Sequence, residues 1–192
     1  LIEHGYPGTR IHLNRDPTDL ELIRPVARDG AFRKRYNIPE NAFVVLYAGS
    51  MGRKQGLMGV VSAADLTRGA NICWVLTGDG ESYGELVEAV RAGGLEDTLR
   101  FVPFQPDADI AAMFADADML LLHQISAIKD TVIPSKLLTY MAAGRPVLAA
   151  VNPTSQAAEL LREADGGVLV APDDPEALPA GARSLTAADP DT

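Results

Sequence analysis

Short apolar runs recur along the chain and predict buried β-strands. Consecutive positions in these runs are β-branched or apolar, without the in–out alternation of a half-exposed sheet, which is typical of parallel strands covered by helices on both faces. The runs span residues 43–49, 72–78, 99–104, 119–123, 146–151 and 167–170. A run at residues 10–13 is expected to add an early strand.

Amphipathic segments of helical length lie between the predicted strands. In the first segment, apolar residues such as Leu57, Val60 and Val61 recur at the spacing of one helix face. The expected helices span residues 54–66, 83–92, 110–117, 135–143 and 156–164, and a weaker one follows Pro175. This alternation implies right-handed crossovers. It predicts an α/β fold, a Rossmann-like three-layer α/β/α sandwich with a mainly parallel sheet of about six strands.

Length and composition favour one domain over residues 1–192. The chain has 192 residues, of which 47% are hydrophobic, enough for a substantial core. Its net charge of −9 argues against nucleic-acid binding, which needs a basic surface. The single cysteine, Cys73, lies in an apolar run, and the histidines are scattered, so neither a disulfide framework nor a zinc site is expected.

Targeting and catalytic motifs are sparse. No apolar run approaches the roughly 20 residues that a membrane span needs. G-x-S-x-G, H-E-x-x-H and C-x-x-C motifs do not occur. The chain begins at Leu1 without a methionine, so we expect a fragment of a longer protein. The cysteine usage fits a reducing, cytosolic setting.

The loop after the first apolar run carries a predicted phosphate site. The segment GSMGRKQG follows a strand and is expected to open a helix. Arg53 and Lys54 would lie at the positive end of the helix dipole, an unfavourable arrangement that a bound anion makes favourable. Gly52 and its neighbouring glycines are expected to let the backbone approach phosphate oxygens. A solvated Arg–Lys pair is the plain alternative, and the G-K-[ST] ending of a Walker loop is missing.

A second helix start, at residues 130–136, shares this electrostatic feature. Pro134 suits the first helical position, which places Ser135 and Lys136 in the first turn. One diphosphate between the two helix starts would account for the cations at both, and a solvated lysine is the alternative. The loop follows a predicted strand that ends at His123, which we expect to lie near the ligand, with strand capping as the alternative.

A third loop, TGDGE, contains a glycine pattern. The spacing of Gly78, Gly80 and Gly84 is similar to a dinucleotide-binding motif, but one such match is weak evidence. Asp79 and Glu81 would repel a pyrophosphate at that helix start. We expect a tight turn that lets a base or ribose approach the backbone, and a plain turn is the alternative.

Six segments occur in an order that carries a family resemblance. They are GSMGRKQGL, VLTGDGE, LRFVPFQP, ADADMLLLH, IPSKLLTYMAAGRPVLA and GGVLVAPDDPEAL. Together they resemble the C-terminal domain of retaining GT-B glycosyltransferases of the group 1 (GT4) family, in the exopolysaccharide branch typified by the colanic acid transferases. The resemblance extends over residues 14–178, and YMAAGRPV is its most specific part.

The resemblance implies a two-domain enzyme in which this chain is the half that binds a nucleotide-diphosphate sugar. Most catalytic residues would then lie in a missing N-terminal acceptor domain. The implied diphosphate-binding residues are Gly52, Arg53, Lys54, Ser135 and Lys136. The implied nucleoside-binding residues are Gly78, Asp79, Gly80, Phe104, Gln105 and Thr139. A loop for the donor sugar or a phosphate comprises Asp130, Thr131, Val132, Ile133 and Pro134.

Two positions depart from the family pattern. Many members carry two glutamates on this last loop and helix, and the second binds the ribose hydroxyls. The matching positions here hold Thr131 and Thr139, and a threonine hydroxyl binds a ribose less strongly than a carboxylate does. We expect Asp130 and Lys136 to replace part of the lost interactions.

These features predict a glycosyltransferase that uses a UDP- or GDP-linked sugar, with retention, in cell-surface polysaccharide or glycoconjugate synthesis. The acceptor, a saccharide or a lipid-linked molecule, would bind the missing domain at the inner face of the cytoplasmic membrane. We expect no cofactor and no metal, and we expect the isolated chain to be inactive. The alternatives are a nucleotide-sugar epimerase of the same architecture, an NAD(P)-binding oxidoreductase domain with Asp107 as its ribose ligand, and a non-catalytic binding domain.

Overall fold

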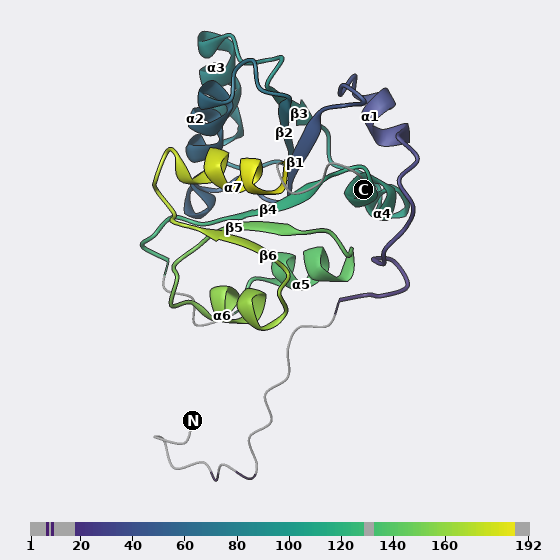
Figure 1. Cartoon of the computed structure of the whole chain (residues 1–192), viewed down its shortest axis with the longest axis vertical. Helices are drawn as coiled ribbons and strands as arrows, with labels where there is room; N and C mark the ends of the chain where they lie inside the picture. The colour runs from purple at the N-terminus through teal and green to yellow at the C-terminus, as the bar shows by residue number, and fades with distance from the viewer. Residues whose placement is uncertain (1–6, 8, 10–17, 129–132, 187–192) are drawn as a thin grey trace.

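The computed structural model describes residues 7, 9, 18–128 and 133–186, and it confirms the predicted fold. Parallel strands form one six-stranded sheet in the order β3-β2-β1-β4-β5-β6 (Figure 1). The strands are β1 (Phe43–Ala48), β2 (Ile72–Thr77), β3 (Leu99–Val102), β4 (Met119–His123), β5 (Val147–Ala150) and β6 (Gly167–Val170). The strand expected at residues 10–13 lies outside the described residues.

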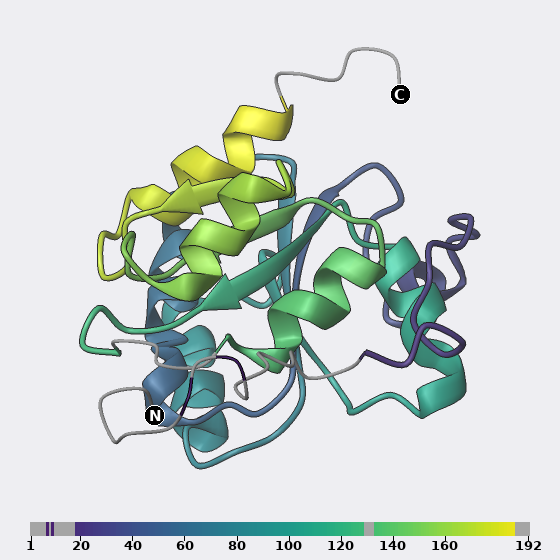
Figure 2. The same cartoon turned by 90° about the horizontal axis from the view of Figure 1, so that it is seen from below.

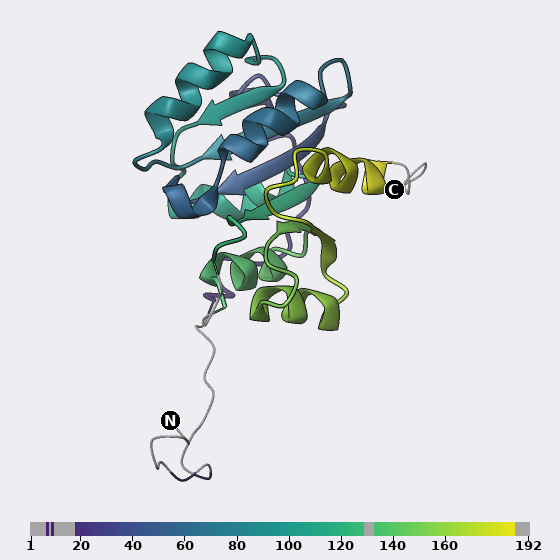
Figure 3. The same cartoon turned by 90° about the vertical axis from the view of Figure 1, so that its left-hand side faces the viewer.

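Helices cover both faces of the sheet, as the continuous apolar runs predict. α1, α4, α5 and α6 pack on one face, and α2, α3 and α7 pack on the other (Figures 2 and 3). Successive strand residues supply the two cores in turn, because Val44 contributes to the first and Val45 to the second. The helices are α1 (Ala31–Arg35), η3 (Arg53–Gln55), α2 (Met58–Leu66), α3 (Tyr83–Gly93), α4 (Asp107–Ala115), α5 (Ser135–Ala142), α6 (Gln156–Glu163) and α7 (Ala177–Thr186).

Several element boundaries differ from the predictions. The first predicted helix begins at Met58 and not four residues earlier, because Gly56 adopts a left-handed backbone (φ 59°) that ends the separate 3-10 turn η3. α5 begins at Ser135, so Pro134 precedes the helix and does not occupy its first position. β3 ends at Val102 because the proline that follows has no N–H for the ladder. The short helix α1 was not predicted.

The strand order reverses between β1 and β4, which are neighbours in the sheet but distant in the chain. From β1 the chain runs outward through β2 to β3, and from β4 it runs outward through β5 to β6. Ligands of such sheets bind in the crevice at the carboxyl ends of the two strands at this switch point. The ladder between the two strands is short, since Val45 pairs with Met119 and Leu46 with Leu120.

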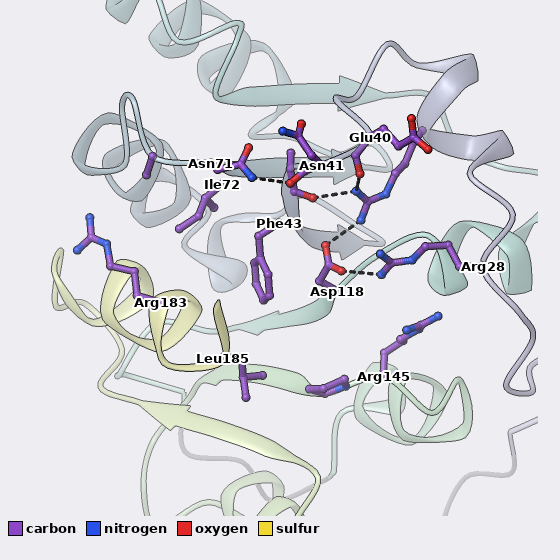
Figure 4. A pocket seen from close by; sticks show the side chains of 14 residues that line it. Arg28, Glu40, Asn41, Phe43, Asn71, Ile72, Asp118, Arg145, Arg183 and Leu185 are labelled. Carbon is purple, nitrogen blue, oxygen red and sulfur yellow. Dashed lines mark hydrogen bonds and ion pairs between the residues drawn. The ribbon is translucent and has the colours of Figure 1, made fainter. Parts of the chain in front are cut away.

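Asp118 joins the amino ends of β1 and β4. Its carboxylate accepts the N–H of Val44 at 2.6 Å, and its own N–H donates to the Val44 carbonyl at 2.9 Å. Arg28 and Arg33 form ion pairs with the same carboxylate at 2.6 and 2.8 Å (Figure 4). The Arg33 side chain is only 4% exposed and also donates to two carbonyls of the loop before β1. We call the boundary between β1 and β4 the seam. A buried charge pair therefore holds the two strands together at this end of the seam.

Arg33→Ala is expected to lower the free energy of unfolding by about 3 kcal/mol or more. It leaves the Glu40 and Ala42 carbonyls without their donor, and Asp118 keeps only the more exposed Arg28 as an ion-pair partner. Arg35→Ala on the same helix removes an exposed ion pair, in which the Arg35 and Asp109 side chains are 59% and 41% exposed. That control is expected to leave the free energy of unfolding nearly unchanged, because solvent screens an exposed ion pair. Urea titration of both variants measures the difference. Equal losses would show that the Arg33 pair contributes no more than a surface pair.

Candidate functional site

A cavity of about 340 Å³ lies at the carboxyl ends of β1 and β2, between α4 and the first turns of α5. Five of the residues predicted from the sequence line it, namely Phe104, Gln105, Ser135, Lys136 and Thr139. They come from the loop after β3 and from α5, which are far apart in the chain. The structure therefore brings predicted nucleoside-binding residues together with one of the predicted phosphate-binding cations.

Lys136 lies in the crevice at the end of β1. Its side chain crosses Gly49 so closely that a Cβ atom at this position would overlap it, and its Nζ lies 5.2 Å from the centre of the Tyr47 ring. Burial lowers the pKa of Lys136. Among the residues that the structure describes, no carboxylate forms an ion pair with this lysine. An anionic ligand would therefore neutralise a partly buried charge.

The beginning of α5 forms one wall of the cavity. Ser135 and Thr139 lie one turn apart on this wall, and the Thr139 hydroxyl donates to the Ser135 carbonyl at 3.2 Å. The hydroxyl oxygen can still accept a hydrogen bond from a sugar hydroxyl. Ile133 and Pro134 precede the helix and are not among the lining residues. The predicted roles of three residues outside the described part of the chain stay predictions, namely those of Asp130, Thr131 and Val132.

The loop after β3 places two predicted residues in different environments. Phe104 is 71% exposed at the cavity, so its ring is available to stack on a planar ligand. Gln105 is only 3% exposed, and its amide donates to the Pro103 carbonyl at 2.6 Å. It also exchanges hydrogen bonds with the Tyr36 hydroxyl. The side chain of Gln105 is therefore engaged within the protein, which leaves its backbone for the predicted contact.

η3 holds the other predicted phosphate-binding cations, outside the walls of the cavity. The Arg53 and Lys54 side chains are exposed. Arg53 Nε lies 3.2 Å from Glu81 Oε1, and the Arg53 N–H donates to the same oxygen at 3.3 Å. The Gly52 N–H donates to the Gln55 side chain at 3.1 Å. A carboxylate therefore occupies the position predicted for an anion, and a diphosphate that binds Arg53 there has to displace it.

The glycines of the third predicted loop allow the loop after β2 to pack closely against the loop after β1. A Cβ atom at Gly78 would overlap the Gly49 carbonyl oxygen, and one at Gly80 would lie 2.7 Å from the Met51 backbone. The φ angles of Gly78 and Gly80, 132° and 156°, are ones that other residues rarely adopt. Asp79 Oδ1 accepts the Gly80 N–H at 2.7 Å, so this amide is not free for a pyrophosphate. The geometry favours a tight turn over a dinucleotide motif.

His123 is the last residue of β4 and does not line the cavity. The ring is buried, and its Nδ1 lies 2.6 Å from the Gln55 carbonyl oxygen. A carbonyl can only accept a hydrogen bond, so Nδ1 carries the proton. Burial lowers the pKa of His123, which favours the neutral ring. The ring therefore links the end of β4 to η3, and its predicted place near a ligand stays a prediction.

Sequence reasoning missed two tyrosines at the site. Tyr47 lies under the Lys136 ammonium, and the Tyr140 hydroxyl bonds both backbone groups of Ala48. Both tyrosines are buried and belong to apolar segments, where an aromatic residue is expected to serve the core. No signal in the sequence distinguishes them from packing residues.

A larger cavity of about 1120 Å³ lies at the amino ends of the strands, opposite the crevice. Arg28, Arg145 and Arg183 are among its lining residues (Figure 4). Arg28 and Arg145 both donate to the Ala115 carbonyl, at 3.2 and 2.6 Å, where α4 ends. Their guanidinium groups therefore bind the negative end of a helix dipole. Ligands of this fold bind at the other end of the sheet.

Metal ligands and membrane spans were sought over residues 7, 9, 18–128 and 133–186. Among these residues, no group of three or more His, Cys, Asp or Glu side chains is placed to hold a metal ion. In the same part of the chain, no helix combines the length and apolar character needed to cross a bilayer.

The fold and the crevice define a Rossmann-like α/β domain with a ligand cavity at its topological switch point. A match to the glycosyl transferases group 1 family spans residues 29–190, so the chain belongs to this glycosyltransferase family and the resemblance is confirmed. WcaI of Escherichia coli (strain K12), named for colanic acid biosynthesis, is 31% identical over 154 residues. The match covers 80% of this chain and 38% of WcaI, so the chain spans about two fifths of that relative.

Solved structures share the fold. The C-terminal domain of LpcC, a group 1 family protein from Francisella tularensis, has a TM-score of 0.71 at 17% identity, covering 89% of this chain and 88% of that domain. Anabaena HepE, solved in complex with UDP, has a TM-score of 0.78 at 21% identity, covering 97% of this chain and 50% of HepE. Both likenesses confirm the Rossmann-like half of a GT-B fold.

Gly78→Ala and Gly84→Ala are expected to have opposite effects, although both residues belong to the same sequence pattern. The first places a Cβ atom against the Gly49 carbonyl at a positive φ, and we expect a loss of at least about 2 kcal/mol of stability. Gly84 lies in α3 with open space around it, so alanine is expected to stabilise by about 0.5–1 kcal/mol. Thermal unfolding measures both variants. A stable Gly78→Ala variant would contradict the backbone packing of these loops.

Proposed function

We propose that this chain is the donor-binding half of a retaining glycosyltransferase and that it binds a UDP- or GDP-linked sugar in the crevice at the switch point. The observation that carries the proposal is Lys136, a partly buried ammonium group without an ion-pair partner among the described residues. It lies at the N-terminus of α5, whose dipole favours an anion. A diphosphate would bind both features together.

The chemistry of transfer explains why cations belong at this place. The nucleoside diphosphate gains negative charge as its bond to the sugar breaks, and groups already oriented toward that charge lower the barrier. Lys136 and the first N–H groups of α5 would stabilise it from one side. Arg53 and Lys54 on η3 would do so from the other, once the diphosphate displaces Glu81 from Arg53. These cations would serve in place of a metal ion, so we propose a reaction that needs none.

The remaining lining residues suit a nucleoside. Phe104 presents an exposed ring on which a base can stack, and Thr139 presents a hydroxyl one turn beyond Ser135, where family members carry a ribose-binding glutamate. The apolar side of the cavity, which includes Met113 and Phe114, would receive the less polar face of the ligand. HepE, a structural neighbour, was solved with UDP, which supports a uridine nucleotide as the first candidate.

The acceptor belongs to a part of the protein outside this chain. WcaI is longer than the matched segment and is named for colanic acid biosynthesis, which supports a role in surface polysaccharide synthesis. We propose a saccharide or lipid-linked acceptor, bound by a second Rossmann-like domain in the cytoplasm at the inner face of the membrane. This chain alone would then bind the donor without turning it over.

The oxidoreductase alternative finds no support in the geometry. Its phosphate site would be the Gly80 amide, which Asp79 already occupies. Its ribose ligand, Asp107, is the first residue of α4 and does not line the cavity. An epimerase of the same architecture would use the same donor site, and its products would distinguish it from a transferase.

Lys136→Ala and Lys54→Ala are each expected to weaken diphosphate binding by more than about 1 kcal/mol, the scale of a charge-assisted hydrogen bond. The effect of Lys136→Ala should be the larger, because Lys136 is partly buried and Lys54 is exposed. Lys34→Ala, an exposed lysine on α1, is the charge-matched control and should leave affinity unchanged. Isothermal calorimetry with UDP and GDP measures all three. Unchanged affinity in both site variants would remove the diphosphate from this crevice.

The base and the metal requirement can be tested on the unmodified chain. A ligand that binds the folded state raises its melting temperature by mass action, so UDP, GDP, ADP and NAD are compared with and without magnesium. We expect UDP or GDP to raise the melting temperature equally in both conditions. A rise that needs magnesium would contradict metal independence, and a rise with NAD alone would contradict the donor site.

A further inference from the structure

We propose that Tyr140 and His123 are positioning residues of the donor site. Each links the segment that follows one of the two switch-point strands, β1 or β4, to the end of the other strand, and we call each of these hydrogen-bonded links a tie. Tyr140, on the helix that follows β4, bonds the end of β1. His123, the last residue of β4, bonds the turn that follows β1. The two ties therefore cross the seam in opposite directions. This inference rests on the proposed donor site.

The Tyr140 tie fills a break in the sheet. The ladder between β1 and β4 ends before Ala48 is reached. Because the Gly49 N–H bonds the Thr77 carbonyl on β2, the alternation of a strand turns both backbone groups of Ala48 toward β4. The Tyr140 hydroxyl accepts the Ala48 N–H and donates to the Ala48 carbonyl, both at 3.0 Å. One hydroxyl thus satisfies both backbone groups of Ala48, which the ladder between β1 and β4 leaves unpaired.

The surroundings of Tyr140 hold its hydroxyl in place. The side chain is 1% exposed, and its ring meets Phe114 edge to face with centroids 5.6 Å apart. Burial raises the pKa of Tyr140, so the hydroxyl keeps the proton that it donates. Lys136 lies one helical turn earlier, and its side chain crosses Gly49, next to Ala48. The hydroxyl therefore fixes Lys136 relative to the end of β1.

The His123 tie holds η3 at the other side of the seam. Its Nδ1 donates to the Gln55 carbonyl at 2.6 Å, and the N–H two residues after it donates to the Lys54 carbonyl at 3.1 Å. The ring fills space that two glycines leave open, since a Cβ atom at Gly56 or Gly59 would lie 3.3 or 3.0 Å from it. The absence of a side chain at Gly56, which the sequence pattern alone attributed to phosphate approach, therefore makes room for the His123 ring and for Ile125, whose Cγ2 would lie 2.6 Å from that Cβ atom.

The crossing of the ties links the two segments that carry the cations. η3 carries Arg53 and Lys54, and α5 carries Lys136. A diphosphate that binds both segments needs a fixed separation between them. η3 is anchored on β4 and α5 is anchored on β1, so neither segment can shift relative to the other while both ties are intact. The ties thus set the separation before a ligand arrives.

Two substitutions break one tie each with little change in volume. Tyr140→Phe removes the hydroxyl, and His123→Leu removes the ring N–H. Calorimetry on the chain with UDP, GDP and inorganic pyrophosphate should show affinity at least about fivefold lower in each variant. His123→Asn offers a side-chain N–H at the position of Nδ1 and should keep the affinity within about twofold even if its melting temperature falls.

Thr67→Val is the matched control. It removes a buried hydroxyl that accepts the Trp74 Nε1–H at 3.0 Å, at the end of α2 and away from the crevice. We expect a lower melting temperature and unchanged affinity. An equal loss of affinity in this control, or full affinity in Tyr140→Phe and His123→Leu, would overturn the positioning role.

Hydrogen exchange without ligand separates this inference from the proposed function. Tyr140→Phe should speed exchange of the Ala48 amide, and His123→Leu should speed exchange over Arg53–Gln55, whereas the Thr67→Val control should do neither. Faster local exchange with full affinity would overturn the positioning role and leave the donor site intact. If the unmodified chain and the full-length protein bind no diphosphate, the proposed function fails and the ties are structural alone.

Discussion

The seam between β1 and β4 is closed at one end and open at the other, and the arrangement of the site depends on this difference. At the amino end, Asp118 joins the two strands through the Val44 N–H and holds the buried Arg33. At the carboxyl end the ladder stops, and Ala48 bonds a helix in place of a strand. A sheet whose order reverses has to provide a crevice, and here the crevice receives Lys136.

Much of the architecture could be predicted from the distribution of apolar residues. Strands that are buried on both faces have to be apolar at consecutive positions, so the runs gave all six strands, and 119–123 and 167–170 with their observed bounds. The same reasoning located part of the site. The carboxyl ends of parallel strands meet at one edge, which is why Phe104, on the loop after β3, and Lys136, in the first turn of α5, share a cavity.

The contacts that fix the site could not be predicted in this way. Arg33, Tyr140 and His123 act through partners far along the chain, and nothing in their local sequence separates them from surface or core residues of the same type. Glycines were misleading for a related reason. The sequence shows that a side chain is missing but not what occupies the space, and at Gly56 the neighbours are Ile125 and His123, where a phosphate was expected.

The close packing of the loops after β1 and β2 has a consequence for how this domain can change. Gly78 lies against the Gly49 carbonyl and Gly80 against the Met51 backbone, so main-chain atoms set the spacing of the two loops. Phe104, in contrast, projects freely. Laboratory evolution toward another ligand should therefore find a few invariant positions that preserve the framework, beside an adaptable rim where substitutions accumulate without disturbing it.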